Sequence, residues 1–480
     1  MNNLRFLDHF SGRWFGLNKL ALLAVSALVT GCAIVVGTLV GQEHWAFLAA
    51  LAGLIVACLW PIEIALGFYA FLLPFNSVSV LGGGTSGTTL NWVVGAITAI
   101  ALLASGIVRK RLKFPPRAAL IWLVFLLWSM LTILWSVQPQ EAIKQLPTSI
   151  ALVGLYILAV SWQITEKQFS FVTLMAVAGG WLASCYVIYL FETGVTYRVT
   201  SRASLFLGGR ETNPDTLATE FIIPLALALV CLLMARGWFG KITSLIAATT
   251  IGYAVLLCMS RAALLAIVVM MAVFAFRLGK NRRLLLVASL LALSLVAVPS
   301  AFFTRLGEAV QTGGAGRFDI WIAGLTIWKR FWATGSGMAT FPVIYNQYAG
   351  NAPVFRGFGR GSHNTLLQVG VELGILGVVL MVMALVAHFG SVRRLRARLH
   401  SVPIPVVGLE SACWGMLTFA LSGDILWSKA FWLSWMLLLM AVKSSEKVLG
   451  GTNGGIARPR QHGRRSDNPA VEIPLLTRSS

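Results

Sequence analysis

Apolar segments of about the length of a membrane span follow one another from residue 20 to residue 442, and they constrain the fold more than any other feature. A soluble domain carries about 25% charged residues, whereas this chain has 57% hydrophobic and only 11% charged residues. Lipid must therefore be its solvent. We predict an all-α fold, a polytopic transmembrane helix bundle, with apolar segments at residues 20–40, 45–60, 62–75, 92–108, 118–135, 149–162, 169–191, 217–235, 242–259, 262–276, 284–302, 365–389, 406–421 and 425–442.

Several of these segments are shorter than a full span, and the second and third can form a shallow hairpin at Pro61. We therefore expect about 12 to 14 spans. If the N-terminus is cytoplasmic, strict alternation places every short basic loop in the cytoplasm, as the positive-inside rule requires. The net charge of +21 thus needs no nucleic-acid partner.

The alternation divides the chain into three parts. Residues 1–19 form a cytoplasmic N-terminus, residues 20–442 the transmembrane domain, and residues 443–480 a basic tail that we expect to be disordered and cytoplasmic. Two long segments, 192–216 and 303–364, fall on the outer face, and the second is expected to be a large helical loop.

Arginines are frequent in both outer segments: Arg202 and Arg210 in the first and Arg317 in the second. Arginine binds phosphate through two parallel hydrogen bonds and stays charged at any working pH. Arg261 follows Ser260 at a tight outer turn between two spans, where an arginine should be paired or face a polar cavity. These residues predict a site for the pyrophosphate of a lipid-linked substrate, and a solvated loop face is the alternative for each of them.

Aromatic residues within the second outer segment recur at helical spacing. The helix that they predict fits two placements. It lies in the membrane interface, or it packs on the outer ends of the spans. The residues are Phe318, Trp321, Ile322, Leu325, Trp328, Phe331 and Trp332.

The sequence SHNTLLQVGVELGILG leads from this segment into the next span. His363 titrates near neutrality and is a candidate base, although a lone histidine is more often structural. Asn364 either contacts substrate or caps the helix that follows. Glu372 lies about two turns into the span, where an ionisable group is either functional or a partner in the packing of the bundle.

The six cysteines lie within apolar stretches and show neither ligand spacing nor a disulfide framework. The outer segments contain no metal-binding motif, and no P-loop or nucleophile elbow occurs in the chain. The residues therefore indicate anion binding with one base, without a metal or a cofactor.

The order of these motifs resembles the bacterial O-antigen ligase family, which shares its domain with O-antigen and exopolysaccharide polymerases. The motifs are RETNPDTLA, SRAALLA at a span end, GRFDIW with a downstream GSG, and SHNTLLQVGVELGILG, with WSVQP as a further feature. The likeness runs over residues 92–442. The family usually has Asn-Pro-Asn where this chain has Asn213, Pro214 and Asp215, which puts a role of the third position in doubt.

The resemblance implies a metal-independent glycosyltransferase on the periplasmic face of the bacterial inner membrane. Its donor is a glycan on undecaprenyl diphosphate, and its acceptor is lipid A–core in a ligase or a lipid-linked glycan in a polymerase. By motif, Arg261 and Arg317 bind and stabilise the diphosphate leaving group, and His363 positions or deprotonates the acceptor hydroxyl. Arg202 and Arg210 are further substrate contacts.

Ligase and polymerase share their chemistry, so sequence leaves both open. A more distant alternative is a glycolipid transporter or flippase, which predicts an internal repeat and charged residues along a path through the bilayer. No repeat is evident, and ionisable residues in the spans are sparse: Glu63, Glu220, Glu372, His388, Glu410 and Asp424. A non-catalytic scaffold does not account for outward arginines beside His363.

Overall fold

A computed structural model describes residues 62–77, 80–81, 88–108, 110–197, 200–207, 210–279, 307, 316–399 and 401–453. Within these residues the chain is mostly helical with almost no strand, as predicted. The strands described are two short antiparallel pairs, in which β1 (Val80–Leu81) pairs with β2 (Thr88–Thr89) and β3 (Phe206–Leu207) with β4 (Arg210–Glu211).

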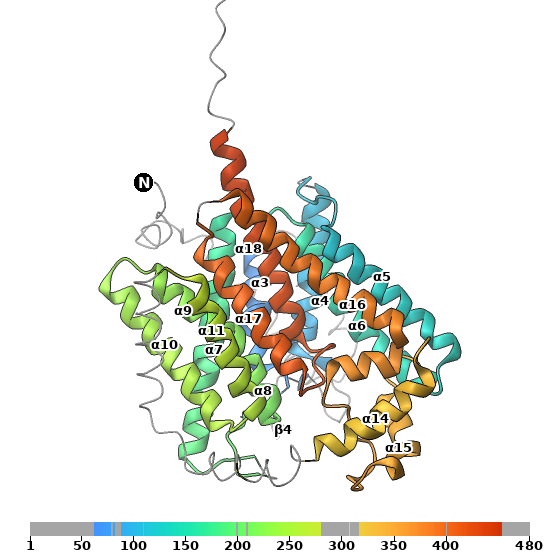
Figure 1. Cartoon of the computed structure of the whole chain (residues 1–480). Coiled ribbons are helices and arrows are strands. Elements are labelled where there is room, and N and C mark those ends of the chain that lie inside the picture. The colour runs from blue at the N-terminus through green and yellow to red at the C-terminus, as the bar shows by residue number, and fades with distance from the viewer. Residues whose placement is uncertain are drawn as a thin grey trace, which may run out of the picture.

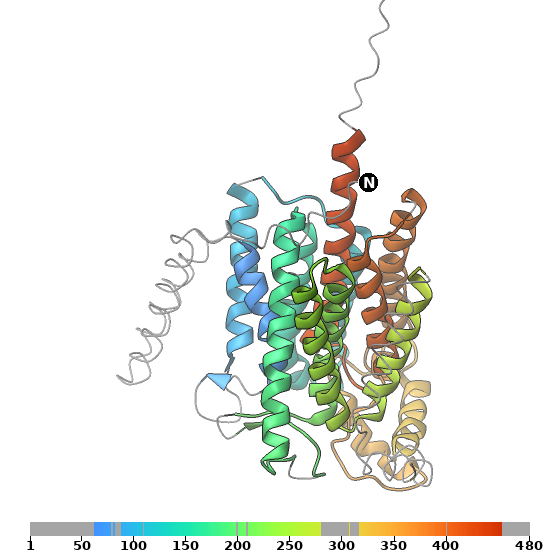
Figure 2. The ribbon, with the colours of Figure 1, turned by 90° about the vertical axis from the view of Figure 1, so that its left-hand side faces the viewer.

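The long helices run roughly side by side and form a bundle (Figures 1 and 2). In the described part of the chain, seven helical segments are long and apolar enough to cross a membrane, and α3 and α17 are shorter apolar helices. The helices of the bundle are α3 (Ile62–Phe71), α4 (Leu90–Val108), α5 (Arg117–Leu131), α6 (Pro139–Ser161), α7 (Glu166–Glu192), α8 (Pro214–Glu220), α9 (Ile222–Met234), α10 (Trp238–Leu257), α11 (Arg261–Arg277), α16 (Thr365–Arg398), α17 (Ile404–Ala420) and α18 (Lys429–Asn453).

Each predicted apolar segment that falls in the described part of the chain corresponds to a helix of this bundle. The segments 20–40, 45–60 and 284–302 lie outside the described residues, so the total of 12 to 14 spans stays a prediction. Helix α18 continues to Asn453, beyond residue 442, where we placed the end of the membrane domain. The rest of the predicted tail lies outside the described residues.

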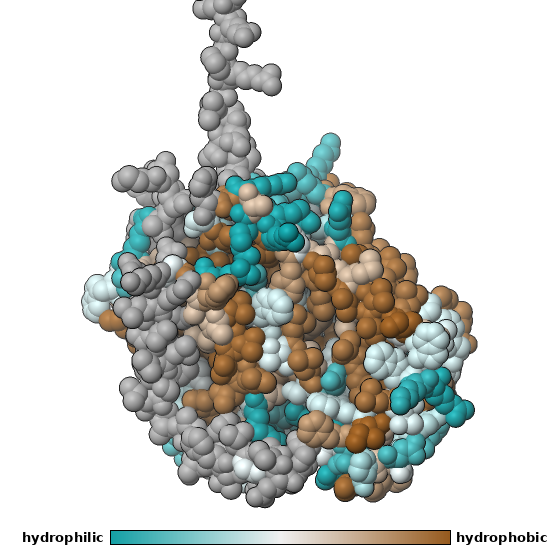
Figure 3. Space-filling model, viewed as in Figure 1, coloured by the Kyte–Doolittle hydropathy of each residue, from teal (hydrophilic) through white to brown (hydrophobic). Residues whose placement is uncertain are grey.

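The core of the bundle follows from how apolar each helix is around its circumference. Helix α9 is apolar on all sides and almost completely buried, because α7, α10 and α17 pack around it. Helix α16 has an exposed apolar face that includes Val379, Val382 and Val386. Such residues form a hydrophobic surface across the middle of the molecule, with hydrophilic residues gathered toward its ends (Figure 3). This distribution is that of a bundle in lipid.

Two shorter helices, α14 (Arg317–Phe331) and α15 (Phe341–Tyr348), lie at one end of the bundle (Figure 1). Helix α14 confirms the helix predicted from the aromatic spacing. One of its faces packs on α15 and on the start of α16 through Ile320, Ala323 and Ile327. Its other face carries exposed apolar side chains: Phe318, Ile322, Leu325 and Trp332. Packing on a span end is thus shown for one face, and placement in the membrane interface stays a prediction for the other.

Helix α16 is broken at Gly374, and the chain that follows α14 packs against this break. Gly374 has a φ of +67°, which suits glycine. The backbone N–H of Ile375 donates to the carbonyl of Trp332 at 2.7 Å. Gly335 passes so close to Glu372 that a Cβ on it would lie 2.2 Å from the Glu372 carbonyl oxygen. The GSG segment, Gly335 to Gly337, is therefore fastened to the break in α16.

Candidate functional site

The turn that carries His363 is wrapped around the carboxylate of Asp424, which lies between α17 and α18. The backbone N–H groups of His363 and Asn364 donate to Asp424 Oδ2 and Oδ1 at 3.0 and 3.2 Å, and the Ser362 hydroxyl also donates to Oδ1. His363 has a φ of +47°, an uncommon conformation for a residue other than glycine. Asp424 therefore fixes the backbone from which the imidazole projects.

Asn364 is the N-cap of α16, as the sequence allowed. Its Oδ1 accepts a hydrogen bond from the backbone N–H of Leu367 at 3.0 Å, and its Nδ2 donates to the carbonyl of Leu421 at 3.1 Å. Both ends of the amide thus hold the start of the helix. Its role as a substrate contact stays a prediction.

The start of α14 brings Arg317 toward this turn. Trp321 lies one helical turn after Arg317, on the same face, and its indole Nε1–H donates to the carbonyl of Ser362 at 3.0 Å. An ion pair between Asp319 and Arg356, 2.6 Å between Oδ2 and Nη2, fastens the same turn of α14 to the loop that leads to His363. Arg317 and His363, 46 positions apart in the sequence, are thereby held at one end of the bundle.

The charge of Arg317 acts on the imidazole. Partial burial is the main cause that lowers the pKa of His363 below its ordinary value, and the guanidinium groups of Arg317 and Arg360 lower it further. The carboxylates of Asp424 and Asp215 oppose this shift. The neutral, proton-accepting imidazole therefore persists to a lower pH than in an exposed histidine, as a general base requires.

A second polar group forms where α8 and α11 begin. Arg202 is buried, and its Nη1 lies 3.1 Å from Asp215 Oδ1, while its Nε donates to the Thr200 hydroxyl at 3.0 Å. The Ser260 hydroxyl also reaches the Asp215 carboxylate, and Arg317 is close enough for its charge to act there. Asp215 thus links the Arg202 loop to the turn that carries Arg261.

Arg261 is the first residue of α11 and is partly exposed next to Ser260, which caps the helix. Arg210 lies on the hairpin β3–β4, partly exposed, a few residues before α8. Helix α8 begins after Asn213, whose side chain accepts from the backbone N–H of Asp215 at 2.8 Å. Arg202, Arg261, Arg317 and His363 therefore gather at one end of the bundle, and Arg210 lies on the hairpin that precedes α8.

Glu372 is buried, and its side chain holds the start of α15. Its carboxylate accepts from the backbone N–H groups of Ala339 and Phe341 at 3.0 and 3.2 Å and from the Gln368 amide. These bonds close the start of α15 onto α16. They support the packing alternative for Glu372, and its role as a substrate contact stays a prediction.

Sequence reasoning missed the role of Asp424, which it counted only among ionisable residues in the spans. The one available signal was its position in a short polar turn, Ser422 to Asp424, between two apolar segments. Nothing in the spacing relates this turn to His363, because the hydrogen bonds join residues about 60 positions apart. Within the described residues, no three His, Cys, Asp or Glu side chains form a group that could hold a metal ion.

Part of the chain that carries the candidate site matches a known protein family. Residues 242–382 match the model of the O-antigen ligase family. The match contains Arg261, Arg317 and His363 and covers α10, α11, α14, α15 and the first half of α16. It confirms over this segment the resemblance seen in the motifs. No curated protein matches the chain.

Proposed function

From the match of residues 242–382 to the O-antigen ligase family, we propose that this membrane protein is a glycosyltransferase of the bacterial inner membrane. The family and the apolar helices support a membrane protein of O-antigen ligase or polymerase type. The proposed donor is a glycan on undecaprenyl diphosphate at the periplasmic face, and the proposed acceptor is a hydroxyl of lipid A–core. The structural observation that supports the proposal is the electrostatic effect of Arg317 on His363, whose two segments are joined by the bond from Trp321 to Ser362.

In the proposed reaction, the acceptor hydroxyl oxygen attacks the anomeric carbon of the donor sugar. The bond from that carbon to the diphosphate oxygen breaks, and undecaprenyl diphosphate leaves with the bonding electron pair. Arg317 and Arg261 bind the diphosphate and stabilise the charge that develops on it. Fixed arginines suit this task because they do not titrate in the working range.

His363 accepts the proton that the acceptor hydroxyl loses. Its lowered pKa favours the neutral imidazole, and Asp424 holds its backbone in place. Asp424 is thus a positioning residue, because its carboxylate is occupied by backbone N–H groups. Arg202, held by Asp215, and Arg210 are proposed as further contacts to the diphosphate or the glycan.

Glu372 and Asn364 are proposed to act next to the substrate by shaping the loop and the helix start on either side of His363. The proposed reaction uses arginines in place of a metal ion and needs no cofactor. We therefore expect transfer by the purified protein to be unchanged by a chelator of divalent cations. Loss of transfer that added Mg²⁺ or Mn²⁺ restores would contradict this mechanism.

A deletion strain tests the function itself, through the surface glycans resolved on a gel. A ligase predicts that long glycan accumulates on the lipid carrier while lipid A–core stays unsubstituted. Single repeat units on the carrier indicate a polymerase of lipid-linked units instead. Loss of secreted polysaccharide with intact lipopolysaccharide indicates an exopolysaccharide polymerase, and unchanged glycans in all fractions contradict the proposal.

A further inference from the structure

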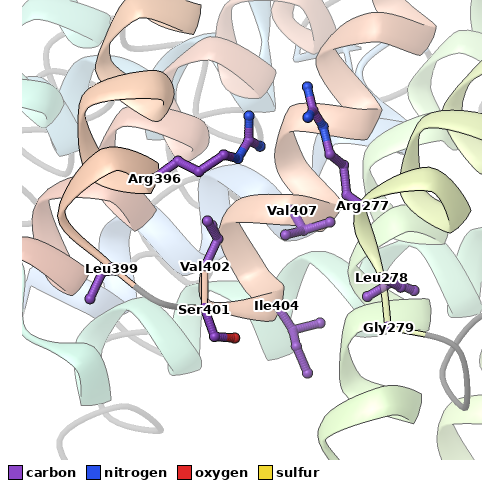
Figure 4. Close-up of a pocket in the computed structure, with 9 residues that line it drawn as sticks. All are labelled: Arg277, Leu278, Gly279, Arg396, Leu399, Ser401, Val402, Ile404 and Val407. Atoms are coloured by element: carbon purple, nitrogen blue, oxygen red, sulfur yellow. The ribbon is translucent and has the colours of Figure 1, made fainter.

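A pocket of about 270 Å³ opens at the end of the bundle opposite His363. It lies where α11 and α16 end and α17 begins, and Figure 4 shows Arg277 and Arg396 reaching from the first two of these helices to the same side of it. Nothing in the proposed transfer reaction uses this end of the molecule.

The charges at this pocket do not balance. Glu410 of α17 is buried and forms ion pairs with both arginines. Arg396 Nη2 lies 2.8 Å from its Oε2, and Arg277 Nη2 lies 3.5 Å from its Oε1. Two guanidinium groups and one carboxylate leave a net charge of +1. Each arginine side chain is 33% exposed, and one carboxylate cannot accept all the N–H groups of two guanidinium groups. The pocket therefore favours an anion.

The walls of the pocket indicate what carries that anion. Two arginines and the hydroxyl of Ser401 make part of the lining polar, and the aliphatic side chains of Leu278, Val402 and Val407 line another part of it. A small soluble anion gains nothing from aliphatic walls, whereas the glycerol and upper acyl carbons of a phospholipid are stabilised by them. The ends of transmembrane helices also lie at the depth of the lipid headgroups, where basic pockets between helices bind acidic lipids.

We propose that this pocket binds the phosphate group of an acidic phospholipid from the leaflet that borders this end of the bundle. Arg277 supplies the charge in excess, because Arg396 and Glu410 already form a close pair. The lipid joins the ends of α11 and α16 to the start of α17. This site does not depend on the proposed transferase function, since the two lie at opposite ends of the molecule.

The test uses the purified full chain in a neutral detergent and measures its thermal unfolding midpoint. Phosphatidylglycerol is titrated in, with phosphatidylcholine and inorganic phosphate as parallel arms. A ligand that binds only the folded state raises the midpoint, and the rise grows with the logarithm of the ligand concentration once that exceeds the dissociation constant. We expect phosphatidylglycerol to stabilise the protein and phosphatidylcholine to do so much less.

Arg277→Gln removes the net charge but leaves Glu410 paired with Arg396, so the fold is expected to survive. It should weaken the apparent affinity for phosphatidylglycerol about tenfold, as the loss of one charge-assisted hydrogen bond would. Arg394→Gln is the matched control. Arg394 is exposed at the same end of α16 and donates a hydrogen bond to Ser391. Its substitution by glutamine changes the net charge of the protein by the same amount as Arg277→Gln.

Glu410→Gln changes the pocket in the opposite sense, since it raises the net charge to +2 and should tighten binding. If inorganic phosphate also stabilises the protein, and Arg277→Gln abolishes that stabilisation, the phosphate site is supported and a soluble phosphate is its source. Equal effects of the two lipids would overturn the proposal, and so would equal affinities of the Arg277 and Arg394 variants.

Discussion

His363 is held in a backbone conformation that costs a residue other than glycine about 1–3 kcal/mol, and its partner in the fold is Asp424. The Asp424 carboxylate accepts hydrogen bonds from the two backbone N–H groups of the turn and from the Ser362 hydroxyl. A negative charge so close to the imidazole also raises the pKa of His363, against the effects of burial and of Arg317. Asp424 thus acts on both the geometry and the proton affinity of the proposed base.

Asp424→Asn is predicted to shift the acidic limb of the pH–rate profile of transfer to lower pH. The substitution removes a charge that raises the pKa of His363, so the imidazole stays neutral to a lower pH. The maximal rate should also fall, because the amide replaces a carboxylate that holds two N–H groups. The profile is measured with the purified protein. An acidic limb that stays in place or moves to higher pH would show that His363 is not the titrating group.

At this scale the sequence allowed part of the site to be predicted. The residue types of Arg261, Arg317 and His363 suit anion binding and proton transfer, and the place of Asn364 before an apolar run offers the cap that the structure shows. Asp424 was not recognised, because its role rests on hydrogen bonds between distant turns. A side chain's distant partners leave no trace in local spacing.

The first turn of helix α14, which carries Arg317, is held by the indole of Trp321 and by the ion pair between Asp319 and Arg356. The spacing of aromatic residues predicted the helix, because the buried face of a helix recurs every three to four residues. The pattern did not reveal which aromatic residue would bond to Ser362. It also gave no sign of the break at Gly374, since a run of apolar residues reads as one continuous span whatever the backbone conformation of a glycine within it.

Trp321→Phe is predicted to lower kcat/KM for transfer by roughly 2- to 10-fold, the effect of losing one neutral hydrogen bond. Trp328→Phe is the matched control on the same helix, because its indole N–H has no hydrogen-bond partner in the described part of the chain. Both variants remove the same atoms from a partly buried indole. Equal losses in the two would mean that Trp321 contributes packing alone.

The whole molecule has its candidate site at one end and its acidic-lipid pocket at the other. The bundle and the helical content were predictable from apolar length and composition, because lipid leaves a chain few other ways to satisfy its backbone. The orientation of the bundle rests on the positive-inside rule alone. It follows that the turn before His363 should face the periplasm and the start of α10 the cytoplasm.

Cysteine labelling tests this orientation with two equally exposed residues. Phe358, near His363, is 70% exposed, and Phe239, at the start of α10, is 71% exposed. In spheroplasts, a membrane-impermeant maleimide is predicted to label Phe358→Cys but to label Phe239→Cys only after lysis. The reverse pattern would place the site in the cytoplasm.

The central claim is that Arg317 and His363 form one transfer site, and glycan transfer by the purified protein from an undecaprenyl-diphosphate donor tests it most directly. His363→Ala and Arg317→Ala are each predicted to lower the rate by about 10²- to 10⁴-fold. Arg330→Ala, an exposed arginine at the far end of α14, should leave it unchanged. Normal transfer by a correctly folded His363→Ala or Arg317→Ala protein would contradict the account.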